Sequence, residues 1–119
     1  MANFVDIFND KLLEFLRELK TSFPNITQFV LYESLTQGAI MMDKNLPQQT
    51  FDANVIAKYG KQIEEKDESF LLEHATSSHV DESFVDSLKT IWRSLDDSNK
   101  QIIWSYIKLL VALNKKITT

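Results

Sequence analysis

Cysteine is absent from this chain of 119 residues, and glycine and proline occur only twice each. A chain without cysteine forms no disulfide, no thiolate zinc site and no iron–sulfur cluster, and it has no cysteine nucleophile. Sheet-rich folds of this size need many tight turns, which glycine and proline commonly supply. The scarcity of both residues therefore favours a few long helices joined by short connections.

The rest of the composition is that of an ordinary globular domain, with 44% hydrophobic and 25% charged residues. At this length, folding removes about two thirds of the unfolded chain's surface from water, so one hydrophobic core is sufficient. We predict an all-α fold in which residues 1–119 form a single-domain bundle of about five to six helices, with a largely buried C-terminal helix.

Apolar residues at three- and four-residue spacing predict an amphipathic helix from Phe4 that ends near Thr21, because the residue before Pro24 avoids helical angles. A second apolar series from Ile26 to Leu35 fits a helical period better than strict alternation, with Gly38 close to its end. Its β-branched and aromatic content leaves a strand as the alternative.

Asp43 to Pro47 is predicted to be a loop, and Thr50 is a plausible cap for a third helix in which Gly60 weakens or ends the helical run. A short fourth helix is predicted to follow the acidic segment 67–69. A fifth runs from about residue 81 to 95, on the apolar stripe Phe84, Val85, Leu88, Ile91, Trp92 and Leu95.

The final helix is predicted from Ser98 to Lys116, opened by a capping box between Ser98 and Gln101. A narrow polar strip runs along it, and the remaining surface is apolar, so we expect the stripes Phe4–Phe23 and Phe84–Leu95 to bury most of it. The strip consists of Gln101, Ser105, Lys108, Ala112 and Lys115. We predict that any uncovered remainder binds a partner through Trp104, Lys108, Val111, Lys115 and Lys116.

Charge is distributed unevenly along the chain. Residues 1–63 carry about −1, residues 64–97 carry −7, and residues 98–119 carry four lysines and no acid. The last helix either packs across the acidic segment, which we prefer, or presents its lysines to a polyanion. Its longest apolar stretch, Ile102 to Leu113, is shorter than the roughly 20 residues that a membrane span requires.

No catalytic, metal or cofactor site is predicted. His74 and His79 are five residues apart, which does not place them on one helical face, so their grouping with Glu73, Asp81 and Glu82 is interpreted as a surface loop. The carboxylates at 64, 65, 67 and 68 fit a solvated helix boundary better than an acid–base pair. Gly38 and Gly60 stand alone, so no glycine-rich phosphate loop exists.

The second half of the chain resembles the short, uncharacterised helical proteins of nucleocytoplasmic large DNA viruses. Tyr59, Ile63, Lys66-Asp67-Glu68, Phe70-Leu71, Trp92, Asn99-Lys100, Ile103-Trp104 and Tyr106 carry this resemblance. It implies a protein made in an infected cell and packaged in the virion, and it transfers no catalytic residue.

We therefore predict a non-enzymatic protein–protein interaction or structural protein, in the form of a virion or virus-assembly component, with a protein partner or self-association. The alternative is a nucleic-acid-associated protein or transcription factor that uses the basic C-terminal helix. Met1 to Asp10 has no early basic residue, unlike a cleaved secretory signal, so an intracellular location is expected, in the host cytoplasm or the virion.

Overall fold

The computed structural model describes residues 3–67, 88–89 and 91–118, and all regular structure in this part of the chain is helical. The helices are α1 (Phe4–Ser22), α2 (Thr27–Met42), α3 (Leu46–Phe51), the π-helix η1 (Asp52–Ile56), α4 (Ala57–Glu64) and α7 (Asp97–Thr118). Because α3, η1 and α4 follow without a break, these elements make four helices in the described part of the chain, fewer than the five to six predicted, and residues 88–89 and 91–92 are also helical. The predicted all-α class is confirmed. The predicted helix around residues 67–72 and the first part of the one at 81–95 lie outside the described residues.

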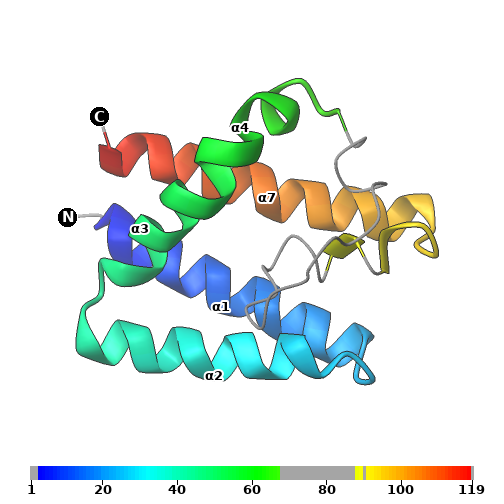
Figure 1. The fold of residues 1–119 in the computed structure, drawn as a ribbon, viewed down its shortest axis with the longest axis horizontal. Coiled ribbons are helices and arrows are strands. Elements are labelled where there is room, and N and C mark those ends of the chain that lie inside the picture. Colours follow the sequence, from blue (N-terminus) through cyan, green and yellow to red (C-terminus); the bar gives the residue numbers. More distant parts are fainter. Residues whose placement is uncertain (1–2, 68–87, 90, 119) are drawn as a thin grey trace.

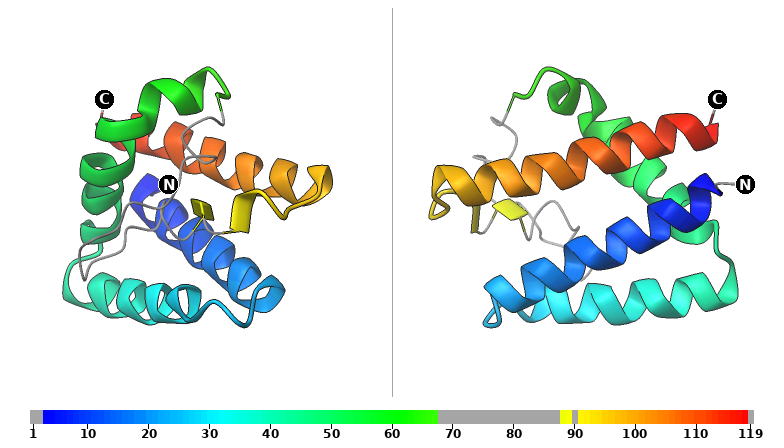
Figure 2. Two further views of the ribbon diagram at one scale, coloured as in Figure 1. Left: turned by 45° about the vertical axis from the view of Figure 1, so that its right-hand side comes forward. Right: turned by 180° about the vertical axis from the view of Figure 1, so that it is seen from behind.

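Helix α1 lies in the middle of the bundle, with α2 on one side and α7 on the other (Figures 1 and 2). The chain direction reverses from α1 to α2, and α7 also runs opposite to α1, so both neighbours are antiparallel to it. The run from α3 to α4 crosses one end of these three helices and connects the end of α2 to the side of α7. Helix α2 is therefore an outer helix that packs mainly against α1.

The first two helices form where the apolar spacing predicts them. Asn3 caps α1, because its Oδ1 atom accepts hydrogen bonds from the backbone N–H groups of Val5 and Asp6, at 3.0 and 3.4 Å. The second segment is a helix, so the strand alternative is wrong. Gly38 does not end that helix: no glycine of the described residues has a positive φ, so Gly38 continues the helix to Met42 instead of capping it.

The third helix begins earlier than predicted. It starts at Leu46 with Pro47 in its first turn, where a missing N–H costs no hydrogen bond, so Thr50 is inside the helix and does not cap it. The loop before it is short, with Asp43 Oδ1 accepting from the Asn45 backbone N–H at 3.0 Å. Gly60 lies within α4 and does not interrupt it.

The last helix begins one residue earlier than predicted, and the proposed capping box is wrong. Asp96, not Ser98, is the capping side chain: its Oδ1 atom accepts from the Asn99 backbone N–H at 2.9 Å. A carboxylate at this place also interacts favourably with the positive end of the helix dipole. Asp96 was not considered as a cap from the sequence alone, although aspartate is as common at this position as serine.

The hydrophobic core lies between α1 and α7 and extends to Leu88, Ile91, Trp92 and Leu95. Phe15 of α1 stacks on Tyr106 of α7, with ring centroids 4.8 Å apart and planes inclined by 12°. Trp92 and Trp104 meet edge to face at 6.0 Å. The expected cover of the last helix by α1 and by the stripe ending at Leu95 is therefore present for the described residues, while Phe84 and Val85 of that stripe lie outside them.

Three polar side chains join the far end of α7 to the run from α3 to η1. Gln48 Nε2 donates to Asn114 Oδ1 at 2.7 Å, and Asn114 Nδ2 donates to Asp52 Oδ1 at 2.9 Å. Gln48 and Asn114 are both buried, so each amide must find a partner inside the protein. These hydrogen bonds hold the run from α3 to η1 against the C-terminal turns of α7.

Candidate interaction surface

The residues predicted to bind a partner on α7 are not all on one surface. Lys108, Lys115 and Lys116 are exposed, whereas Trp104 and Val111 are buried in the core. Trp104 and Val111 lie at the edge of the buried side of α7, and the lysines lie on the neighbouring exposed side. In this fold the two apolar residues contact other parts of the chain, and only the three lysines are accessible to a partner.

The predicted polar strip of α7 is the side that faces solvent. All five of its positions are exposed, from Gln101 to Lys115, and the apolar residues Ile102 and Leu109 flank it. Two apolar side chains separated by two turns and bordered by lysines make a mixed surface rather than a continuous apolar one. The uncovered apolar part of α7 is therefore small, although more than half of the residues of this helix are exposed.

Two of the four lysines of α7 contact groups of the chain itself. Lys115 Nζ lies 2.6 Å from Glu64 Oε1, and this hydrogen bond and charge lower the pKa of the Glu64 carboxyl. Lys100 Nζ lies 5.6 Å from the centre of the Trp92 ring, within the range of a cation–π interaction. Glu64 and Trp92 both belong to the acidic segment 64–97, so these contacts agree with the interpretation that the basic helix packs across that segment.

Most of the exposed large apolar side chains of the described residues lie on α2, where the sequence analysis predicted no interaction site. Leu31 and Leu35 are 55% and 57% exposed, and Met41 and Met42 are 89% and 84% exposed. Val30 is also exposed, and Ser34 and Gly38 lie between these residues on the same side of the helix. We refer to Leu31, Ser34, Leu35, Gly38, Met41 and Met42 as the α2 face.

The position of α2 in the bundle explains this exposure. As an outer helix packed mainly on α1, α2 has one side that no other described helix covers (Figure 2). Phe29 is its only buried side chain. The sequence signal was available: segment 27–42 contains no lysine or arginine and is apolar on both sides, a pattern that requires cover on both sides.

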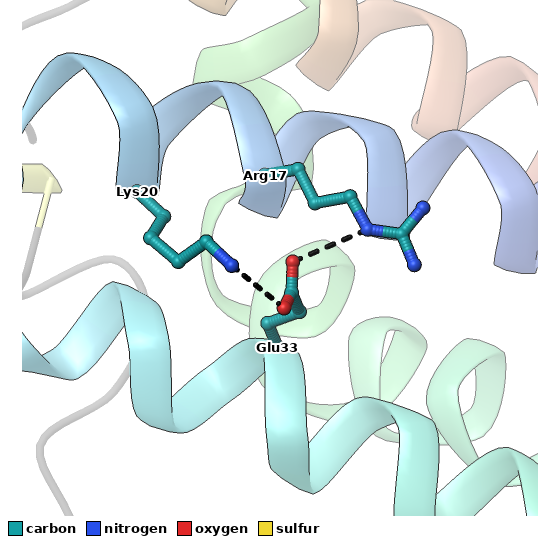
Figure 3. A network of polar contacts seen from close by, with 3 residues as sticks. All are labelled: Arg17, Lys20 and Glu33. Carbon is teal, nitrogen blue, oxygen red and sulfur yellow. Dashed lines mark hydrogen bonds and ion pairs between the residues drawn. The ribbon is translucent and has the colours of Figure 1, made fainter.

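The single charged residue of α2 points away from the α2 face. Glu33 lies between Lys20 and Arg17 of α1, with 2.9 Å from its Oε1 to Lys20 Nζ and 3.3 Å from its Oε2 to Arg17 Nε (Figure 3). The hydrogen bond from Lys20 and the charges of both bases outweigh the effect of burial and lower the pKa of Glu33. The outward side of α2 is left without a charge.

No contact within the described fold requires a glycine at position 38. A Cβ atom built at this position meets no heavy atom within 4 Å. A helix with glycine at an interior position is less stable than one with alanine there, by about 1 kcal/mol. At Gly38 neither a turn nor a close contact within the chain offsets that loss. Gly38 therefore leaves an open notch in the α2 face between Leu35 and Met42.

Other kinds of site find no support in the described part of the chain. Residues 3–67, 88–89 and 91–118 contain no group of three histidine, cysteine or acidic side chains placed to hold a metal ion. The grouping around His74 and His79 lies outside these residues, as does Glu68. Within the same ranges, no helix has both the length and the apolar character needed to cross a membrane.

Comparison with protein-family models, with curated proteins and with solved structures found no match to this chain. The class of the protein, an all-helical bundle, therefore rests on the structure itself. The viral resemblance remains a prediction.

Proposed function

We propose that this protein is a non-enzymatic interaction protein that docks onto another protein surface through the α2 face. The observation that supports this proposal is a group of largely exposed apolar side chains on one uncharged side of α2. Large exposed apolar patches on soluble proteins typically mark interaction sites, because leaving them in water is unfavourable. The proposal keeps the predicted class of function and moves the site from α7 to α2.

A role as a virion or virus-assembly component is the specific form of this proposal. It is supported by the resemblance of the second half of the chain to short helical viral proteins, and by the suitability of an apolar helix face for assembly contacts. Assembly proteins act by contact and need no reactive residues, which agrees with the sequence's lack of a catalytic motif.

The alternative, nucleic-acid binding by α7, has less support. Phosphate binding requires a group of uncompensated cations, whereas Lys115 is paired with Glu64 and the chain has a net charge of −4. Lys108 and Lys116 remain exposed on α7. Two lysines beside apolar residues form a weak electrostatic surface compared with the basic stripe of a typical nucleic-acid-binding domain.

The proposal is tested by charging the α2 face. The double variant Leu31→Glu, Leu35→Glu should lose any protein association that the wild-type chain shows, whether in sedimentation of the purified protein or in capture experiments with extracts of cells that express it. The matched control is Ile102→Glu, Leu109→Glu, which charges two exposed apolar residues of α7 and should retain the association. A wild-type chain that neither self-associates nor captures any protein contradicts the proposed function.

A further inference from the structure

We infer that the α2 face binds the α2 face of a second copy of this chain, with the two helices antiparallel and related by a twofold axis. In this arrangement Leu35 of each copy packs into the notch at Gly38 of the other, and Leu31 packs beside Met42. The inference rests on the proposed function and names the partner of that surface.

The spacing along the α2 face suits this geometry. Leu31, Leu35, Gly38 and Met42 follow one another at steps of four, three and four residues, so the pattern is the same when read in either direction. In an antiparallel pair of identical helices, residue numbers rise along one helix and fall along the other, so the numbers of any two facing residues add to the same total. Leu35 of one copy then faces Gly38 of the other, and Leu31 faces Met42. A twofold interface must be self-complementary in this sense, because each copy uses the same surface.

Shape favours the same pairing. The exposed Leu35 side chain lies next to open space at Gly38 on its own helix, so two copies facing each other place one protrusion opposite one notch, twice. Glycine allows two helix backbones to approach closely, which increases the dispersion contacts between them. This contact explains the glycine at position 38, which no contact within a single chain requires.

Charge does not oppose the pairing. The only charged residue of α2 is Glu33, which α1 neutralises on the inner side, so no like charges meet across the α2 face. Asp43, exposed just after α2, comes beside the first turn of the second copy's helix, which has no acidic residue and no capping side chain. A carboxylate near such a helix start is favourable.

The size of the contact sets the expected affinity. Helix α2 has 16 residues and is about 24 Å long, so a pairing along it belongs to the smaller class of interfaces. We therefore expect a dimer with a dissociation constant of roughly micromolar size. Sedimentation velocity of the purified full chain between low and high micromolar concentration covers this range.

Gly38→Leu separates specific packing from general apolar adhesion. The substitution makes the α2 face more apolar and improves helix propensity, so non-specific association would become stronger. In the proposed dimer the new side chain fills the notch that Leu35 occupies, and the dissociation constant should rise at least tenfold. Leu35→Glu should give a monomer, while Ile102→Glu should leave the dimer unchanged. Circular dichroism confirms that each variant retains its helix content.

Cross-linking tests the antiparallel direction, and the absence of cysteine makes the background clean. A mixture of the Leu31→Cys and Met42→Cys variants should form a disulfide-linked heterodimer under mild oxidation. Each variant alone should cross-link much more slowly, because identical positions near the helix ends are far apart in an antiparallel pair. Fast cross-linking of Met42→Cys with itself indicates a parallel pair and overturns the inference.

The outcomes distinguish this inference from the proposed function. A monomeric wild-type chain that captures a different protein through the α2 face overturns the dimer and supports the proposed function. A monomeric chain without any protein partner overturns both. A dimer that Leu35→Glu and Gly38→Leu leave intact overturns the inference, because its interface then lies elsewhere.

Discussion

Asn114 and Asp52 are 62 positions apart in the chain, and the Asn114 Nδ2 atom donates a hydrogen bond of 2.9 Å to Asp52 Oδ1. The same amide accepts a hydrogen bond from Gln48 through its oxygen. The Asn114 side chain, near the end of α7, thereby forms hydrogen bonds with two residues of the run from α3 to η1, Gln48 and Asp52. An amide at position 114 suits this geometry, because it offers both a donor and an acceptor.

Asn114→Asp should destabilise the protein in a pH-dependent way. The new carboxyl group loses the donor to Asp52 and is buried beside another acid, so its pKa in the folded state is raised above the unfolded value. A raised pKa means that stability falls as pH increases through that range, and we expect a loss of about 2 kcal/mol at pH 8 and less at pH 4.5. Urea unfolding at both pH values measures the difference.

Asn114→Ala is the control for this effect. It removes the same two hydrogen bonds without adding an acid, so its destabilisation should be similar at both pH values. If Asn114→Asp behaves in the same way at pH 4.5 and pH 8, the contact with Asp52 is not present in solution.

Substitutions on opposite sides of α7 should differ strongly in their effect on stability. Trp104→Ala removes a buried aromatic side chain that packs against Trp92, and it should reduce the free energy of unfolding by about 3–5 kcal/mol. Ile102→Ala, at a half-exposed position on the same helix, should reduce it by less than about 1 kcal/mol. Equal losses in thermal or urea unfolding would mean that α7 is rotated about its axis relative to this structure.

Glu33→Gln should make the protein less sensitive to acid. The pKa of Glu33 is lowered from 4.5 in the folded state, so its ion pairs stabilise the fold above that pH and are lost as the pH falls through the folded pKa. The variant lacks this contribution at every pH. We expect it to be less stable than the wild type by about 1 kcal/mol at pH 7, with the two converging as the pH falls through the lowered pKa of Glu33.

Glu64→Gln provides the comparison on the surface. Both partners of its ion pair with Lys115 are exposed, so water screens their charges. The substitution should therefore change stability less than Glu33→Gln does. An equal decrease in the free energy of unfolding of the two variants would contradict the greater burial of Glu33 compared with Glu64.

The lysines of α7 provide a prediction about nucleic acid. We expect no more than weak, non-specific binding of DNA or RNA at about 150 mM salt, because few phosphates can be neutralised. The triple variant Lys108→Glu, Lys115→Glu, Lys116→Glu should abolish any binding seen at lower salt. Fluorescence anisotropy with a labelled oligonucleotide measures both. Tight binding at 150 mM salt that the triple variant removes would favour the nucleic-acid alternative.

The long amphipathic helices were the most predictable part of the fold. The spacing of Phe8, Phe15 and Leu19 predicts α1 and its buried side, because a helix period brings these side chains to one stripe. The exposed strip of α7 was also predictable, since its polar residues share one side. Helix boundaries were less accurate: Pro47 lies in the first turn of a helix where a loop was predicted, because proline fits a first helical turn as well as a break.

The candidate site was harder to predict, since apolar residues look alike in a sequence whether they lie in a core or on a surface. Trp104 and Leu35 both belong to apolar helices, yet one is buried and the other exposed. The difference depends on how many neighbours each helix has, and that number is a property of the assembled bundle.

Local patterns in the amino-acid sequence therefore account for the helical class and for the inner side of each strongly amphipathic helix, because both depend on residues within a few turns of each other. The uncovered side of α2 and the contact of Asn114 with Asp52 were decided by tertiary structure. They depend on which helices become neighbours, and segments far apart in the chain must pack before an apolar side chain is either covered or left to a partner.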